Sequence, residues 1–119
     1  MIARLELEVG FSAAHRVDSP RASCAGLLHG HNFRVRVAFE GQIDPVSGTV
    51  VDAPRAEALL RELVFAPFDH GVLNDLIENP TLERVAAHIF GALATVLPVA
   101  ELSLEDGAGR RAVVKPSAP

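Results

Sequence analysis

Three histidines stand where the sequence predicts the ends of two neighbouring β-strands. His29 and His31 are two residues apart, and His15 lies upstream. In a strand, residues i and i+2 project from the same face about 6.6 Å apart, so two imidazoles at this spacing can converge on one ion. A His-x-His pair alone is more often structural than metal-binding, but a third histidine of matching parity favours a metal site.

The matching parity comes from two segments in which apolar and polar residues alternate, a pattern typical of half-buried strands. The apolar members occupy odd positions: Leu5, Leu7, Val9, Phe11 and Ala13 in the first segment, and Phe33, Val35, Val37 and Phe39 in the second. The same parity leads to His15 in the first segment and to His29 and His31 in the second. All three imidazoles therefore extend the apolar face of a predicted strand.

Three neutral imidazoles without a nearby cysteine pair are typical of a catalytic zinc site. Structural zinc sites fill all four tetrahedral positions, usually with thiolates, whereas catalytic sites leave one position for water or substrate. Imidazole also suits copper, iron and nickel, so the ligand type alone does not select zinc.

Four further residues have side chains that can do chemistry. Cys24, the single cysteine, lies in a loop five residues before His29, where a nearby cation favours the thiolate; the alternative is a small buried apolar residue. Asp69 and His70 are adjacent, so their side chains meet only if the chain bends there. Glu105 lies in a predicted strand, and its carboxylate either binds a ligand or is simply solvated.

Composition limits the class of protein. The chain has 119 residues, and we expect one domain over residues 1–119. A net charge of -4 and a pI near 5.7 argue against a nucleic-acid-binding surface. The single cysteine excludes an internal disulfide, and neither a signal-peptide core nor a membrane span is apparent. We expect a cytoplasmic protein with no nucleic-acid or membrane partner.

The sequence patterns predict an α+β fold with the order strand, strand, helix, helix, strand, strand. The elements are expected over residues 5–15, 29–40, 52–66, 79–97, 102–104 and 112–114. Asp52 is interpreted as the cap of the first helix, which ends before Pro67, and His88 as an exposed residue of the second. This order favours a four-stranded antiparallel sheet with two helices on one face. Its two edges need to be covered or paired.

Several separated motifs together resemble the 6-pyruvoyl-tetrahydropterin synthase superfamily. They are Phe11–His15, Cys24–His31, Phe68–Asp75, Glu78–Glu83 and Leu104–Glu105. Their order and spacing are similar to those of the superfamily over nearly the whole chain, which makes the resemblance more specific than any single motif. Within the superfamily, the sequence most resembles the 6-carboxy-5,6,7,8-tetrahydropterin synthase branch, which feeds queuosine and 7-deazaguanine synthesis.

The resemblance implies a T-fold subunit whose sheet joins its neighbours edge to edge, with active sites at subunit boundaries. A trimer or a pair of stacked trimers is expected, and a tetramer is the alternative. The implied substrate is 7,8-dihydroneopterin triphosphate. Zinc on His15, His29 and His31 is expected to act as a Lewis acid on the side-chain hydroxyls. The carboxy branch then releases triphosphate and acetaldehyde, whereas the pyruvoyl branch keeps the side chain intact.

The resemblance also assigns roles to the other four residues. Cys24 is the implied general base, and Asp69 and His70 the implied proton relay. Glu105 is the implied anchor of the pterin ring, because a carboxylate accepts two hydrogen bonds from the planar donor pair of the ring.

This chain departs from the family pattern at two places. Four residues separate Cys24 from His29, where members near the carboxy branch carry three, and Asp106 follows Glu105 where threonine is usual. Four basic residues could meet a triphosphate, but each is more simply interpreted as a solvated surface residue. They are Arg16, Arg110, Arg111 and Lys115.

Alternatives to the carboxy reaction remain open. One is the pyruvoyl reaction, and another is an aldolase-type cleavage of the side chain of dihydroneopterin itself, since loop changes near Cys24 can redirect chemistry on one scaffold. The non-enzymatic alternative is a zinc- or pterin-binding oligomer.

Overall fold

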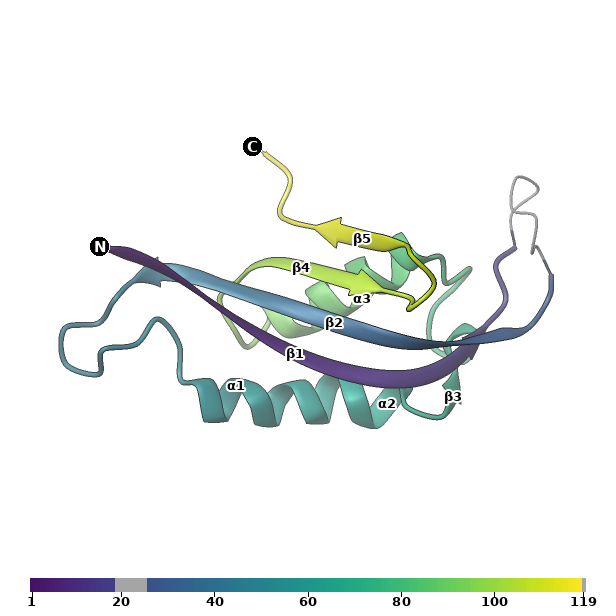
Figure 1. Ribbon diagram of the computed structural model, residues 1–119, viewed down its shortest axis with the longest axis horizontal. Coiled ribbons are helices and arrows are strands. Elements are labelled where there is room, and N and C mark those ends of the chain that lie inside the picture. The colour runs from purple at the N-terminus through teal and green to yellow at the C-terminus, as the bar shows by residue number, and fades with distance from the viewer. Residues whose placement is uncertain (19–25, 119) are drawn as a thin grey trace.

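The computed structural model describes residues 1–18 and 26–118. Two long strands, β1 (Ile2–His15) and β2 (His29–Gln42), dominate it and run side by side (Figure 1). They pair antiparallel along their whole length, from Ile2 opposite Gln42 to His15 opposite His29. This pairing carries the two predicted strands to a common end of the sheet.

The rest of the sheet extends to both sides of this pair. Strand β4 (Val99–Glu105) pairs antiparallel with β2, and β5 (Arg111–Val114) pairs antiparallel with β4, which confirms the predicted closing hairpin. A fifth strand, β3 (Gly71–Val72), pairs parallel with β1 and makes the order β3-β1-β2-β4-β5. The predicted four-stranded sheet omits it, because two residues are too few to show an alternating pattern.

One face of the sheet forms the hydrophobic core together with the helices. The odd-numbered residues of β1 and β2 point into it, and Phe11, Phe33, Val35 and Val37 are all buried. Since side chains alternate along a strand, the same face continues to the three histidines at the end of β1 and the start of β2. The opposite face is charged. It carries the ion pairs Arg4–Glu101, Arg36–Glu8 and Arg111–Glu105.

The first helical segment runs further than predicted. Helix α1 (Ala53–Leu60) begins after Asp52, whose carboxylate accepts a hydrogen bond from the Arg55 N–H and confirms the predicted cap. The chain then continues through a π-helical turn, η1 (Arg61–Phe65), into the short helix α2 (Ala66–Phe68). The prediction that the helix ends before Pro67 is wrong. The wider π-turn shifts the backbone hydrogen bonds and so accommodates a residue without an N–H.

Helix α3 (Leu82–Ala94) confirms the second predicted helix. Its N-cap is Thr81, whose hydroxyl accepts a hydrogen bond from the Arg84 N–H at 3.1 Å. Its apolar side is fully buried against the sheet, and His88 lies on the exposed side as predicted. The short 3-10 helix η2 (Leu73–Asp75) follows β3. No helix in the described part of the chain is long and apolar enough to cross a membrane.

Candidate metal centre and active site

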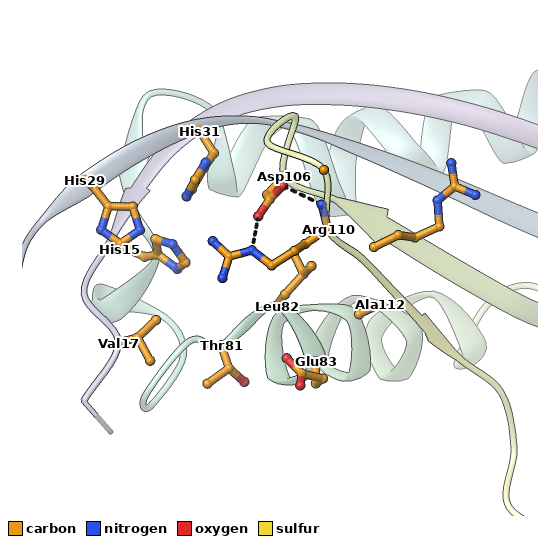
Figure 2. A pocket seen from close by; sticks show the side chains of 12 residues that line it. His15, Val17, His29, His31, Thr81, Leu82, Glu83, Asp106, Arg110 and Ala112 are labelled. Carbon is orange, nitrogen blue, oxygen red and sulfur yellow. Dashed lines mark hydrogen bonds and ion pairs between the residues drawn. The ribbon is translucent and has the colours of Figure 1, made fainter. Parts of the chain in front are cut away.

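The three predicted metal ligands come together at one end of the sheet. Nitrogen atoms of His15, His29 and His31, one per ring, lie within 4.8 Å of one another. The β1–β2 register explains this, because His15 pairs directly with His29 and Ala13 pairs with His31. Figure 2 shows the three rings facing a common space. The geometry therefore suits a single metal ion.

Hydrogen bonds orient two of the rings. The Nδ1 atom of His15 lies 2.8 Å from the carbonyl oxygen of Pro80, and that of His29 lies 3.0 Å from the carbonyl oxygen of Leu27. A carbonyl only accepts, so each Nδ1 carries the proton and each Nε2 keeps a lone pair. This arrangement is the usual one for histidines that ligate a metal through Nε2.

A test of the fit to a metal comes from the buried nitrogen of His15. Its Nε2 atom is buried and has no hydrogen-bond partner among the described residues. Buried polar atoms are almost always paired, and an electron-pair acceptor such as a metal ion would satisfy this one. Burial lowers the pKa of His15, and the neighbouring His29 and His31 lower it further against the opposing effect of the Pro80 carbonyl. The neutral imidazole is the form that binds metal.

The histidines line a pocket of about 560 Å³. The N-terminus of α3 contributes Thr81, Leu82 and Glu83 to its wall, and the β4–β5 loop contributes Asp106 and Arg110 (Figure 2). A cavity of this size is in the range that holds a small organic ligand. The pocket lies on the side of the sheet that the helices cover.

Asp69 and His70 form the predicted dyad at a different place. The Nδ1 atom of His70 donates a hydrogen bond to the Asp69 carboxylate, and the other carboxylate oxygen accepts one from the Ser12 N–H at 2.9 Å. The bend that the contact requires is present, because His70 has a φ of 61°, in the left-handed region. The dyad lies beside the edge strand β3, outside the wall of the histidine pocket, but His70 lines a second pocket together with His31.

Glu105 lies on the charged face of the sheet. Its neighbours Leu104 and Asp106 are buried on the core side, and Glu105 points the other way and pairs with Arg111 at 3.0 Å. One chain therefore does not bring Glu105 to the three histidines. Cys24 lies within residues 19–25, outside the described residues.

Comparison with known proteins decides the family. The model of the 6-pyruvoyl tetrahydropterin synthase family matches residues 4–115. The chain belongs to this family. An Archaeoglobus fulgidus protein that carries the provisional name 6-carboxy-5,6,7,8-tetrahydropterin synthase is 40% identical over 88 residues, which are 74% of this chain and 73% of that protein.

Two further proteins extend the comparison. The dihydroneopterin monophosphate aldolase of Pyrococcus furiosus is 33% identical over 111 residues, covering 90% of this chain and 92% of the aldolase. The structure of Caenorhabditis elegans 6-pyruvoyl tetrahydropterin synthase superposes with a TM-score of 0.87 at 28% identity, covering 98% of this chain and 97% of that one. The T-fold expected from the sequence is thus confirmed, and the homologues are pterin-processing enzymes.

Two residues of the pocket wall were not assigned a role from the sequence. The sequence shows Asp106 only as a departure from the family pattern, and Arg110 as a basic residue that could meet a triphosphate but is more simply solvated. In the structure Asp106 is 4% exposed and its carboxylate binds the Arg110 Nε at 3.1 Å. The signal was an acid and an arginine four residues apart around the glycine-rich turn Gly107–Gly109.

Proposed function

We propose that this chain is a zinc-dependent lyase that converts 7,8-dihydroneopterin triphosphate to 6-carboxy-5,6,7,8-tetrahydropterin, in queuosine and 7-deazaguanine synthesis. The reaction releases triphosphate and acetaldehyde. The observation that carries the proposal is the three-histidine cluster, with a buried, unpaired Nε2 on His15, in a pocket large enough for a pterin. The similarity to the Archaeoglobus fulgidus protein supports the carboxy branch.

The metal fits the residues that are present. His15, His29 and His31 would hold zinc, which supplies Lewis-acid polarisation of the hydroxyl groups of the substrate side chain. His15 and His29 need no rearrangement to act as ligands, because the carbonyls of Pro80 and Leu27 already fix their tautomers. The proposal for the metal therefore depends on the donor atoms and not only on family membership.

The remaining roles are those that the family resemblance implies for each side chain. Cys24 is proposed as the general base that removes a proton from the substrate side chain. His70 moves a second proton at its Nε2, because its Nδ1–H is held by Asp69. Glu105 is proposed to accept hydrogen bonds from the pterin ring, in exchange for its present partner Arg111.

A homo-oligomer is part of the proposal. Within one chain Glu105 points to the face of the sheet opposite the histidine pocket, and neither Asp69 nor His70 belongs to the wall of that pocket. A neighbouring subunit can supply the missing groups if sheets associate through their edges. Strands β3 and β5 are the two edges of the sheet.

The test is product analysis. Purified, zinc-loaded protein is incubated with 7,8-dihydroneopterin triphosphate, and the products are identified by mass spectrometry. We expect 6-carboxy-5,6,7,8-tetrahydropterin, with acetaldehyde trapped as a hydrazone. A product that retains the three-carbon side chain would contradict the proposal and place the chain in the pyruvoyl branch. Binding of the substrate without turnover would support the non-enzymatic alternative.

A second candidate is cleavage of a dihydroneopterin phosphate by an aldol mechanism. The Pyrococcus furiosus aldolase aligns over 92% of its own length, and the four-residue spacing between Cys24 and His29 departs from the carboxy branch. The same assay with 7,8-dihydroneopterin monophosphate separates the two reactions. An aldolase would release a two-carbon aldehyde that still carries the phosphate, whereas the carboxy reaction eliminates triphosphate.

A further inference from the structure

The β4–β5 loop is built around one buried carboxylate. The Oδ1 atom of Asp106 accepts hydrogen bonds from the Ala108 N–H at 2.8 Å and from the Arg110 N–H at 3.3 Å. The Asp106 N–H in turn donates to the Arg110 carbonyl at 3.2 Å. These bonds close the loop and place Arg110 at a set position on the wall of the histidine pocket.

The guanidinium of Arg110 is held at one nitrogen and free at the others. Its Nε donates to Asp106 Oδ2 at 3.1 Å, and the side chain remains 70% exposed. Figure 2 shows the guanidinium extending from Asp106 toward His15, His29 and His31. No other ion pair of Arg110 occurs within residues 1–18 and 26–118. Two terminal amino groups are thus left for a ligand, in the planar arrangement that matches a phosphate.

Arg111 provides an internal comparison, because it follows Arg110 directly. Its Nη2 pairs with Glu105 on the opposite face of the sheet. Arg111 also lines the pocket, but this pairing already engages its guanidinium. Glu83 and Asp106 also line the pocket, and the chain has a net charge of -4. Of the two arginines that line the pocket, Arg110 is the one whose terminal amino groups have no protein partner among the described residues.

We propose that Arg110, positioned by Asp106, binds a phosphoryl group of the substrate side chain and selects phosphorylated over unphosphorylated pterins. This inference rests on the proposed function, because it takes the pocket to be the pterin side-chain site. Arg110 is the binding residue. Asp106 is a positioning residue, which acts by holding Nε and leaving the terminal amino groups for the ligand.

The experiment compares two ligands that the enzyme does not turn over, neopterin and neopterin triphosphate. Their affinities for the zinc-loaded protein are measured by calorimetry. Loss of a charge-assisted contact in Arg110→Gln should weaken neopterin triphosphate binding by about 10- to 100-fold and leave neopterin binding unchanged. Arg110→Lys keeps the charge without the planar guanidinium, so its affinity for neopterin triphosphate should lie between those of the parent and Arg110→Gln. Asp106→Asn should also weaken the binding of neopterin triphosphate and leave the binding of neopterin unchanged.

The matched control is Arg61→Gln, which removes the same charge from an exposed arginine of the π-turn, outside the histidine pocket. It should bind both ligands like the parent. Equal weakening of both ligands in Arg110→Gln, or of neither, would overturn the proposal. Melting temperatures identify any variant that fails to fold. If Arg110→Gln fails to fold, Arg110→Ala and Arg110→Lys take its place. A preference for neopterin triphosphate over neopterin as strong as the parent's, in either variant, would then overturn the proposal.

Failure of the proposed function gives a different result. If the parent binds neither pterin, the pocket is not a pterin site, and the Arg110 assignment is then tested with inorganic triphosphate alone. Binding that is lost in Arg110→Gln but kept in Arg61→Gln supports an anion site at Arg110. Equal binding by the parent and Arg110→Gln overturns it. The zinc content is measured after each titration, because triphosphate also chelates zinc.

Discussion

His15 differs from the other two histidines of the cluster in its burial. It is 5% exposed, whereas His29 and His31 are only partly buried. A buried imidazole stays neutral more readily, because burial disfavours the charged form. Its Nδ1–H bond to the Pro80 carbonyl also fixes the ring. Of the three histidines, His15 is therefore the one whose ring is most firmly held neutral and oriented for metal binding.

The first prediction concerns the metal content. His15→Ala should reduce bound zinc from about one equivalent per chain to near zero after dialysis, because two histidines seldom retain zinc against a competing buffer. Elemental analysis measures it. His88→Ala is the control, since His88 is an exposed histidine on α3 and should leave the zinc content unchanged. Full zinc retention in His15→Ala would show that the metal, if present, binds elsewhere.

The second prediction concerns pH and Asp69. The Ser12 N–H, followed by His70, holds the pKa of the Asp69 carboxyl below its usual value. A lowered pKa in the folded state stabilises the protein above the unfolded value, near 3.8, and this contribution is lost as the pH falls through the folded pKa.

In thermal melts of metal-free protein at pH 7, the parent should have a higher melting temperature than Asp69→Asn. The difference should shrink as the pH falls below about 4. An equal difference at both pH values would contradict the assigned pKa direction. Asp75→Asn is the control, because this aspartate makes no ion pair among the described residues.

At the scale of elements, the β4–β5 loop joins the charged face of the sheet to the pocket. It contains Gly107 with a φ of 74°, a conformation that favours glycine. A Cβ there would lie 3.0 Å from the backbone oxygen of Asn32 in β2. The loop that carries Asp106 and Arg110 therefore depends on a close approach to the strand that carries His31.

The third prediction follows from this approach. Gly107→Ala should lower the free energy of unfolding by about 1 to 3 kcal/mol, because the backbone conformation is strained for alanine and the Cβ contacts a backbone atom. Denaturant titration measures it. The control is Gly91→Ala in α3, where a Cβ meets no neighbouring atom; it should raise the free energy by about 0.5 to 1 kcal/mol through helix propensity. Equal effects of the two substitutions would refute the prediction.

At the scale of the whole molecule, the groups proposed for one reaction are distributed over the subunit. The histidine pocket lies on the helix-covered face, His70 beside the edge strand β3, and Glu105 on the charged face. A closed ring of identical subunits would bring these groups together, because each interface joins different surfaces of two neighbouring subunits. That residues 1–119 form one domain of such a ring stays a prediction, as does the role of Cys24.

The fourth prediction is subunit complementation. His31→Ala and His70→Ala should each be inactive alone. If every site takes its histidine cluster from one subunit and His70 from the next, random mixing in equal amounts should restore about a quarter of the parental activity. Denatured variants are mixed and refolded together, and turnover is measured. A mixture that stays inactive would show that His70 acts with the cluster of its own chain; each variant refolded alone is the control.

The sequence itself determined that the three histidines share the apolar face of their strands, and the β1–β2 register then brought them together. Strand alternation is a local rule with a period of two, so the parity of Phe11 and Phe33 extends directly to His15 and His31. The position of Glu105 on the other face follows from the same rule, because Leu104 is a core residue. The Asp52 cap and α3 are also local, since they depend on residues within one or two turns.

Only the tertiary structure decided the features that depend on distant contacts. Strand β3 exists because β1 offers it an edge, and its two residues carry no pattern of their own. The Asp69–His70 contact depends on the left-handed backbone of His70, whose N–H donates to the Ser12 carbonyl on β1. The orientation of Arg110 depends on the burial of Asp106. Local pattern predicts which face a side chain occupies, but contact between segments far apart in the chain is settled when they pack together.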